Sequence, residues 1–438
     1  MEKTLTDDPG ANPCIGAVAA AELQAIAAAS GLRPWQLGGR TLLPIVQGGM
    51  GVGVSAGGLA GTVAGLGAVG TISSVDLRRH HPDLMARTAD VARQPDAKAR
   101  VDAANLEALG REIARARKLA AGRGLVAINV MKAVMEYEHY VRHSLACGID
   151  AVVVGAGLPL DLPELARDHP KTALIPILSD ARGVQLLVRK WEKKGRLPDA
   201  IVIEHPRLAG GHLGASKIAD LQDRRFDFDV VLPEATAFLR SAGLEGRIPL
   251  IPAGGISCLQ DIQRLQAIGA SAVQLGTAFA VTRECDAHPE FKRILAGAKP
   301  QDIVEFTSVA GLPARAVRTP WLDRYLRQEE KLKGKAHEQR CNQWFDCLAH
   351  CGLRDGNAGW GQFCIDKYLG HALAGQVNQG LFFRGAGRVP FGTQIRSVQE
   401  LMRWLLGGIL PPGVEENEID GWPALEYTEA LVAAEQGE

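Results

Sequence analysis

IPLIPAGGIS, residues 248–257, and AVQLGTAFA, residues 272–280, are the most informative stretches of this chain. Each begins as a short apolar run and ends in glycine, at Gly254 and Gly255 in the first and at Gly276 in the second. Glycine lets a backbone come close to an oxyanion, and the start of a following helix offers unpaired N–H donors with a favourable dipole. Two such strand ends in succession predict a phosphate-binding site rather than two ordinary turns.

The same pattern extends back along the chain. Short apolar or β-branched runs end in glycine or a polar residue and lead into helical patterns. Strands that are apolar throughout and alternate with helices indicate a parallel sheet covered on its outer face. Eight repeats over about 250 residues predict a closed (β/α)8 barrel, the TIM barrel, which often binds phosphate on its last two loops. The expected strands are 42–47, 68–74, 125–130, 151–154, 173–178, 200–203, 249–252 and 272–275.

The loop after the first expected strand, QGGMGVGVSAG at residues 47–57, supports a competing interpretation. Gly51, Gly53 and Ala56 match the GxGxxA fingerprint of a dinucleotide-binding Rossmann domain, and Asp76 follows the next strand. Glycines are so dense here that the match arises easily, and a Rossmann domain would leave the seventh and eighth loops unexplained. The barrel is therefore the prediction, and an open doubly wound sheet is the alternative.

The chain has 438 residues, which suits one large barrel with an appendage. We expect an N-terminal helical segment at 1–34, the barrel at 35–322, and a mostly helical C-terminal extension at 323–438. Within the barrel, residues 75–100 are polar and are expected to form a surface excursion. The charge run RQEEKLKGKAHEQR at 327–340 is most simply a solvent-exposed helix.

Four of the eight cysteines fall within 24 residues of the C-terminal extension: Cys341, Cys347, Cys351 and Cys364. Cys347 and Cys351 are four apart, so a helix would place them on one face. The spacing contains no CxxC pair, and buried free thiols without a metal are therefore the prediction. A zinc or iron–sulfur site is the alternative.

The composition gives no support for several classes of partner. Lys plus Arg and Asp plus Glu both number 49, so the zero net charge gives no support for nucleic acid or an anionic membrane surface. No apolar run reaches the roughly 18 to 20 residues that span a bilayer. The acidic first residues are unlike a secretory signal, and the scattered cysteines fit a reducing compartment. We therefore expect a cytoplasmic protein that acts on a small molecule; whether it forms a homo-oligomer is left open.

LAGGHLG, residues 208–214, places His212 directly after two glycines in a loop that follows the sixth expected strand. Such loops form the active face of a barrel, and an imidazole pKa near 6.5 suits acid–base work. We predict that His212 is catalytic, with a helix-capping role as the alternative. His205 is a second candidate to face the site. Asn129, in the third strand, offers an amide that suits the edge of a planar ring.

At these residues the chain resembles the nitronate monooxygenase family, also called 2-nitropropane dioxygenase-like proteins, which includes flavin-dependent enoyl-ACP reductases. The matching pieces occur in family order over about residues 40 to 320. They are LPIVQGGMGVGVS, AINV, LAGGHLG, IPAGGI, AVQLGTAF and TSVAGLPARAVRT. The resemblance implies the barrel fold and FMN as the cofactor. One departure is that many members carry Gln and Glu where this chain has His205 and Leu208.

The resemblance also implies roles for individual residues. His212 matches the active-site histidine of the family. The backbone at Gly49 and Met50 would lie along the isoalloxazine ring, and Asn129 would bond that ring. The residues expected to bind the cofactor are Gly49, Met50, Asn129, Gly211, Gly254, Gly255, Gln274, Gly276 and Thr277.

Two activities follow from the resemblance. The first is oxidation of an alkyl nitronate with O2 to a carbonyl compound and nitrite, in which His212 orients the anion or removes the α-proton of a neutral nitroalkane. The second is reduction of an enoyl thioester at the expense of NAD(P)H. The family-wide name favours the monooxygenase, and the reductase is the alternative. A flavin-binding protein without catalysis, whose C-terminal extension recruits a partner, is a third and weaker hypothesis.

Overall fold

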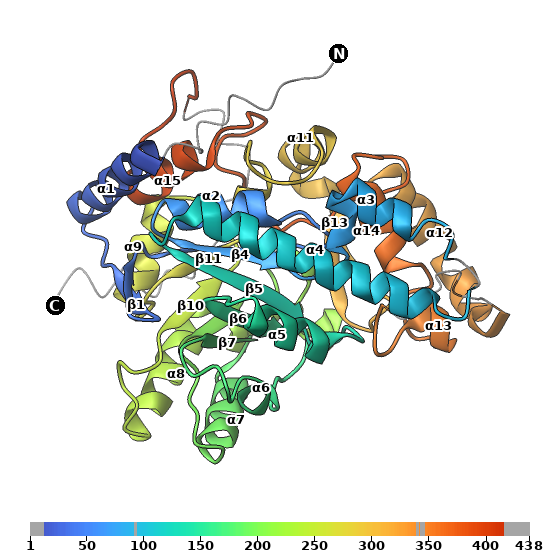
Figure 1. Cartoon of the computed structure of the whole chain (residues 1–438), viewed down its shortest axis with the longest axis horizontal. Helices are drawn as coiled ribbons and strands as arrows, with labels where there is room; N and C mark the ends of the chain where they lie inside the picture. Colours follow the sequence, from blue (N-terminus) through green and yellow to red (C-terminus); the bar gives the residue numbers. More distant parts are fainter. Residues whose placement is uncertain (1–12, 92–93, 339–340, 342–346, 416–438) are drawn as a thin grey trace.

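The computed structural model describes residues 13–91, 94–338, 341 and 347–415. Within those residues the chain forms a closed barrel of eight parallel strands, in the order β10-β11-β3-β4-β5-β6-β7-β8 (Figure 1). Each lies within or beside an expected strand, which confirms the predicted barrel over the open sheet. The strands are β3 (Ile45–Gln47), β4 (Val69–Ser73), β5 (Leu125–Met131), β6 (Ala151–Gly155), β7 (Ala173–Leu178), β8 (Ile201–Glu204), β10 (Leu250–Ala253) and β11 (Val273–Leu275).

The barrel strands are apolar on both faces because both faces are buried. One set of side chains, including Ala127, Val153 and Val202, forms a cluster inside the barrel. The alternate set, including Ile128 and Val152, belongs to the larger core under the helices. A short hairpin of β1 (Trp35–Leu37) and β2 (Arg40–Leu42) precedes the first barrel strand and adds apolar side chains to the inner cluster.

Helices follow the barrel strands and cover the outside of the barrel, as the alternation of strands and helices in the sequence predicts. Close packing explains the glycines of the first covering helix, α2: a Cβ on Gly61 would lie 2.8 Å from the Cα of Ala116 in α4. The fourth, α6, is a single turn of 4 residues. The covering helices are α2 (Gly57–Gly65), α4 (Ala97–Ala120), α5 (Tyr137–Ala146), α6 (Leu162–Leu165), α7 (Ala181–Glu192), α8 (Phe228–Ser241) and α9 (Leu259–Ala267).

Residues 75–100 differ from the expected surface excursion. Their first half contains a 3-10 turn, η2 (Leu77–His80), and α3 (Pro82–Arg87), and Leu77 is fully buried in the main core. Asp76 and Arg78 are also buried, and they form an ion pair at 2.8 Å. The expectation was wrong here because paired charges can be buried where single charges cannot. The pairing also uses Asp76 structurally, which removes it as the ribose-binding carboxylate of a Rossmann domain.

Outside the barrel, a three-stranded antiparallel sheet joins β12 (Ile303–Thr307), β13 (Pro313–Val317) and β9 (Gly211–His212). It fixes a loop of the barrel to a segment about 100 residues later in the chain.

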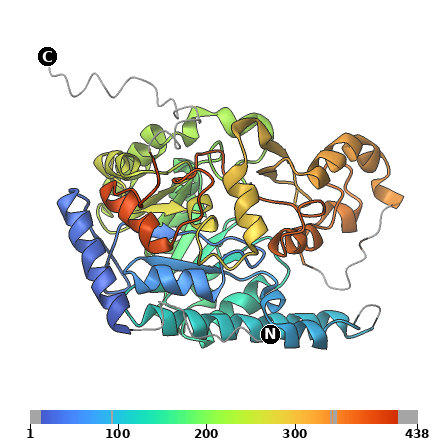
Figure 2. The same ribbon diagram turned by 90° about the horizontal axis from the view of Figure 1, so that it is seen from above.

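The extension after residue 322 contains helices joined by long irregular stretches, and the buried core continues into it. The charge run begins inside α12, which confirms a helix as far as residue 334. The last helix of the described residues, α15, packs against α1, across the molecule from α12 and α13 (Figure 2). No helix of the described residues is long and apolar enough to cross a membrane. The helix before the barrel is α1 (Pro13–Ala29). The helices of the extension are α12 (Pro320–Gly334), α13 (Gly352–Asp355), α14 (Ile365–Leu373) and α15 (Val398–Gly407).

Candidate active site at the carboxyl end of the barrel

A cavity of about 640 Å³ opens at the carboxyl ends of the barrel strands. This is the end of a parallel barrel at which catalytic and binding residues gather. Every residue predicted from the sequence to be catalytic or to bind the cofactor lines this cavity. They are Gly49, Met50, Asn129, Gly211, His212, Gly254, Gly255, Gln274, Gly276 and Thr277. The structure thus brings together residues spread over 229 positions, while their individual roles stay predictions.

One wall of the cavity comes from the loop after β3, which contributes glycine backbone at Gly48 and Gly49 together with the Met50 side chain. A Cβ on Gly49 would lie 2.3 Å from the Cβ of Asn129, and one on Gly48 would lie 3.2 Å from the Gln274 side chain. A side chain at Gly49 would therefore collide with Asn129, and one at Gly48 would press on Gln274. The result is a stretch of glycine backbone edged by two side-chain amides, which suits a planar heteroaromatic ring.

The other end of the cavity is formed by the loops after β10 and β11. Gly254 and Gly255 have φ values of 116° and 75°, a region that side chains rarely adopt. Gly276 differs, because its φ is −109° and the nearest heavy atom to a Cβ would be the Met50 sulfur at 3.7 Å. Glycine at 276 is thus required by neither the backbone nor the surrounding protein. A ligand occupying that space would explain it.

The start of α9, the helix that follows the loop after β10, leaves fewer backbone N–H donors free for a ligand than the sequence suggests. The backbone N–H groups of Ser257 and Cys258, just before α9, both donate to the Asp261 carboxylate, at 2.8 and 3.2 Å. These donors are therefore not available to a phosphate. A phosphate in this region would depend on the glycine backbone and on any cation nearby.

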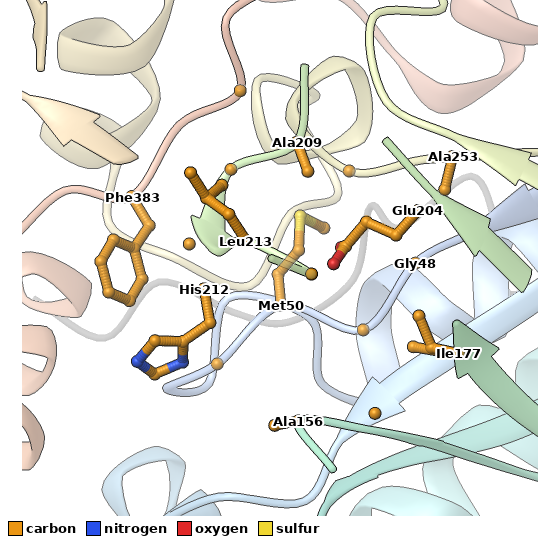
Figure 3. Close-up of a pocket in the computed structure, with 18 of the residues that line it drawn as sticks. Gly48, Met50, Ala156, Ile177, Glu204, Ala209, His212, Leu213, Ala253 and Phe383 are labelled. Carbon is orange, nitrogen blue, oxygen red and sulfur yellow. The ribbon is translucent and has the colours of Figure 1, made fainter. Parts of the chain in front are cut away.

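His212 is held by the small sheet outside the barrel. It lies opposite Ala314 in β13, and its Nε2 is 2.9 Å from the Ser308 hydroxyl. Its ring lies 5.8 Å from that of Phe383, and both line the cavity (Figure 3). Burial lowers the pKa of His212 to about 4, so the imidazole is neutral at neutral pH.

The loop that precedes His212 is fixed by Arg315, a residue that was assigned no role from the sequence. The Arg315 guanidinium is fully buried and donates to the backbone carbonyls of Pro206, at 3.1 Å, and of Ala209. It also donates to the Glu305 carboxylate at 2.5 Å. Arg315 therefore ties the loop after β8 to the small sheet. The matching motif at 307–319 contained this arginine but did not show what it would contact.

Glu204, the last residue of β8, is a further group that sequence reasoning missed. It lines the cavity, and its carboxyl is directed into it near Met50 (Figure 3). Burial raises the pKa of Glu204 to about 7, and the positive charge of Arg315 partly offsets this rise. Its position at a strand end was the only signal that the sequence offered.

His205 does not face the cavity, so the hypothesis that it does was wrong. Its side chain is buried, with Nε2 at 3.2 Å from an oxygen of Asp227, and its ring meets Phe228 edge-on at 5.1 Å. The side chain of Leu208 lines the cavity instead.

Cys347 connects the C-terminal extension to the cavity, which it lines. Burial raises the pKa of its thiol, and Asp366, Cys364, Cys351 and Cys341 raise it further, so these groups lie near one another. Among the described residues, no three His, Cys, Asp or Glu side chains are placed to hold a metal ion. The free-thiol interpretation stays a prediction.

Comparison with known proteins gives a consistent result. The family model described as nitronate monooxygenase matches residues 39–407. A Bacillus subtilis protein named "Probable nitronate monooxygenase" is 28% identical over 161 residues, which are 37% of this chain and 43% of that protein. The chain therefore matches less than half the length of this relative.

Two solved structures share the fold at 20% sequence identity. FabK from Thermotoga maritima has a TM-score of 0.54, over 83% of this chain and 91% of that one. Nitroalkane oxidase from Streptomyces ansochromogenes has a TM-score of 0.53, over 83% of this chain and 94% of that one. At this level of identity the likeness shows a shared fold.

Proposed function

The chain belongs to the nitronate monooxygenase family, and on that premise we propose that it is an FMN-dependent oxidoreductase. Its proposed reaction is oxidation of alkyl nitronates with O2 to carbonyl compounds and nitrite. The observation that carries the proposal is a single cavity lined by the glycines after β3, the glycines after β10 and β11, and His212.

The residues present fit FMN. The glycine backbone at Gly49, with the amides of Asn129 and Gln274 beside it, suits the ring, and the open space over Gly276 suits the phosphate end. Bound FMN would supply an acceptor for the electrons that leave the substrate carbon. The protein would supply binding, orientation and exclusion of water.

His212 would act on the substrate as a neutral imidazole. Because its pKa is low, the ring is neutral at neutral pH, and one nitrogen of a neutral imidazole can accept the α-proton of a nitroalkane. The Nε2 nitrogen is hydrogen-bonded to the Ser308 hydroxyl. With a nitronate already formed, the same ring would orient the anion. Ser308 also accepts a hydrogen bond from the Ala310 N–H at 3.2 Å, so its hydroxyl is itself held in place. Ser308 would therefore be a positioning residue.

Glu204 would make the reaction pH-dependent, since a nitronate is an anion and Glu204 lines the same cavity. Its pKa near 7 means that it is neutral in mildly acidic solution and charged above pH 7. We expect kcat/KM for a pre-formed nitronate to fall as the pH rises through 7, and this fall to be absent in Glu204→Gln. Steady-state rates from pH 6 to 9 measure it.

Glu234→Gln is the matched control, because Glu234 is exposed on α8. It should reproduce the wild-type profile. If kcat/KM of Glu204→Gln falls with pH as it does in the wild type, a group other than Glu204 causes the pH dependence.

Anaerobic mixing separates the proposed activity from an NAD(P)H-dependent enoyl-thioester reductase. We expect the purified protein to be yellow, to release FMN rather than FAD on denaturation, and to lose its flavin absorbance on mixing with a nitronate. NADH and NADPH should bleach it slowly or not at all. Fast bleaching by a nicotinamide, with none by a nitronate, would favour the reductase. A colourless protein that binds NAD tightly would contradict both.

A further inference from the structure

Part of the C-terminal extension lies directly over the phosphate end of the cavity. We call residues 384–388 the 384–388 loop; four of them, Arg384, Gly385, Gly387 and Arg388, line the cavity together with barrel residues. The Gly385 N–H donates to the Thr277 hydroxyl at 3.0 Å, and the Ala386 N–H donates to the Leu208 carbonyl at 3.0 Å. A Cβ on Gly387 would lie 3.1 Å from the Cα of Gly255. The loop therefore touches the strand-end loops after β8, β10 and β11.

This loop carries the cations of the cavity. Among the described residues that line it, the only lysine or arginine side chains are Arg384 and Arg388, and both come from the extension. The carboxylates that line it are Asp180, Glu204 and Asp366. The barrel thus offers an anionic ligand backbone groups but no positive charge, although its cavity is edged by acids.

The two arginines have different surroundings. Arg384 is buried and braces the loop, donating from Nε to the Leu295 carbonyl at 2.9 Å and from Nη1 to the carbonyls of Gly385 and Gly387 at 2.8 and 3.0 Å. Arg388 is half-buried, and its hydrogen bond within the described chain runs from Nε to the Ser257 hydroxyl at 3.0 Å. Within the described residues, no ion pair is found for its terminal amino groups. Arg388 is thus anchored beside the glycine loop with donors left to offer.

We propose that Arg388 binds the phosphate of the cofactor, so that the site is built jointly by the barrel glycines and the C-terminal extension. The inference rests on the proposed function, because it takes FMN as the ligand. A nearby positive charge stabilises a bound phosphate dianion, and Asp261 already takes the N–H donors of Ser257 and Cys258 before α9. A guanidinium with both terminal amino groups directed to one anion is the usual protein solution. The 384–388 loop is therefore part of the cofactor site, and the extension is more than an appendage.

Flavin binding to the full-length, flavin-stripped protein tests this, with FMN and riboflavin compared because they differ by the phosphate alone. Arg388→Ala should weaken FMN binding by about 10- to 100-fold, the range of one charge-assisted hydrogen-bonded contact, and leave riboflavin binding unchanged. Arg388→Lys should recover part of the loss, since it keeps the charge but not the fork. Arg327→Ala is the control, because Arg327 lies on α12 with its side chain 72% exposed. It should bind both flavins as the wild type does.

Two results would overturn the inference. One is unchanged FMN affinity in Arg388→Ala. The other is an equal loss for FMN and riboflavin, which would mean that Arg388 supports the fold of the loop rather than the phosphate. A wild-type protein that binds neither flavin would overturn the proposed function itself, and this inference with it.

Discussion

His212→Asn is expected to keep FMN bound and to lose about 10²- to 10⁴-fold in turnover of a neutral nitroalkane, the usual contribution of a positioned acid–base group. The buried imidazole is neutral because its pKa is about 4, and β9 and Ser308 fix its place in the cavity. Asparagine fills a similar space and can still hydrogen-bond, but it cannot accept the α-proton. A pre-formed nitronate needs no proton removed, so its oxidation should fall much less.

Steady-state rates with both forms of the nitro compound, at equal flavin content, measure this difference. Ser308→Ala should give a smaller loss in the same direction, because it frees the ring without removing it. His139→Asn is the matched control, since His139 is 70% exposed on α5 and is not among the residues that line the cavity. If His212→Asn oxidises both forms at the wild-type rate, the histidine is structural and the catalytic assignment is wrong.

Gly276→Val is expected to yield a folded, colourless protein whose affinity for FMN is at least about 100-fold lower, which corresponds to about 2.7 kcal/mol. The backbone at 276 has an ordinary φ of −109°, and a Cβ would be in normal contact with Met50 at 3.7 Å. The added side chain should therefore cost the fold little. It would instead fill the space assigned to the phosphate end of the cofactor.

Flavin content after purification, FMN titration and a thermal unfolding curve together separate binding from folding. Gly297→Val is the control, because a Cβ at Gly297 would have no heavy atom within 4 Å, and it should stay yellow. Gly255 is a less decisive position, since its φ of 75° makes any side chain strained whatever the ligand does. A Gly276→Val protein that retains FMN with wild-type affinity would show that the phosphate end lies elsewhere.

The sequence predicted the parts of this protein that depend on local pattern. Runs such as the one that became β6 are apolar in every residue because both faces of a barrel strand are buried. Glycines at the ends of those runs marked loops with an unusual backbone or a close approach, as at Gly49 and Gly254. A closed barrel then brings successive strand ends to one face, so the positions of Asn129, His212 and Gly276 in one cavity followed from their order in the chain.

The tertiary structure alone decided what those residues touch and how they titrate. The charge state of Glu204 depends on burial and on Arg315, which comes from 111 residues later in the chain. His205 and Glu204 are neighbours at a strand end, yet one turns to Asp227 and the other to the cavity. Arg388 reaches Ser257 across 131 positions. Local periodicity depends on which faces of a strand or helix are buried. A pKa, by contrast, depends on the water that folding removes and on the charges that folding brings near. Contacts between distant segments also form only on folding, so no local pattern contains that information.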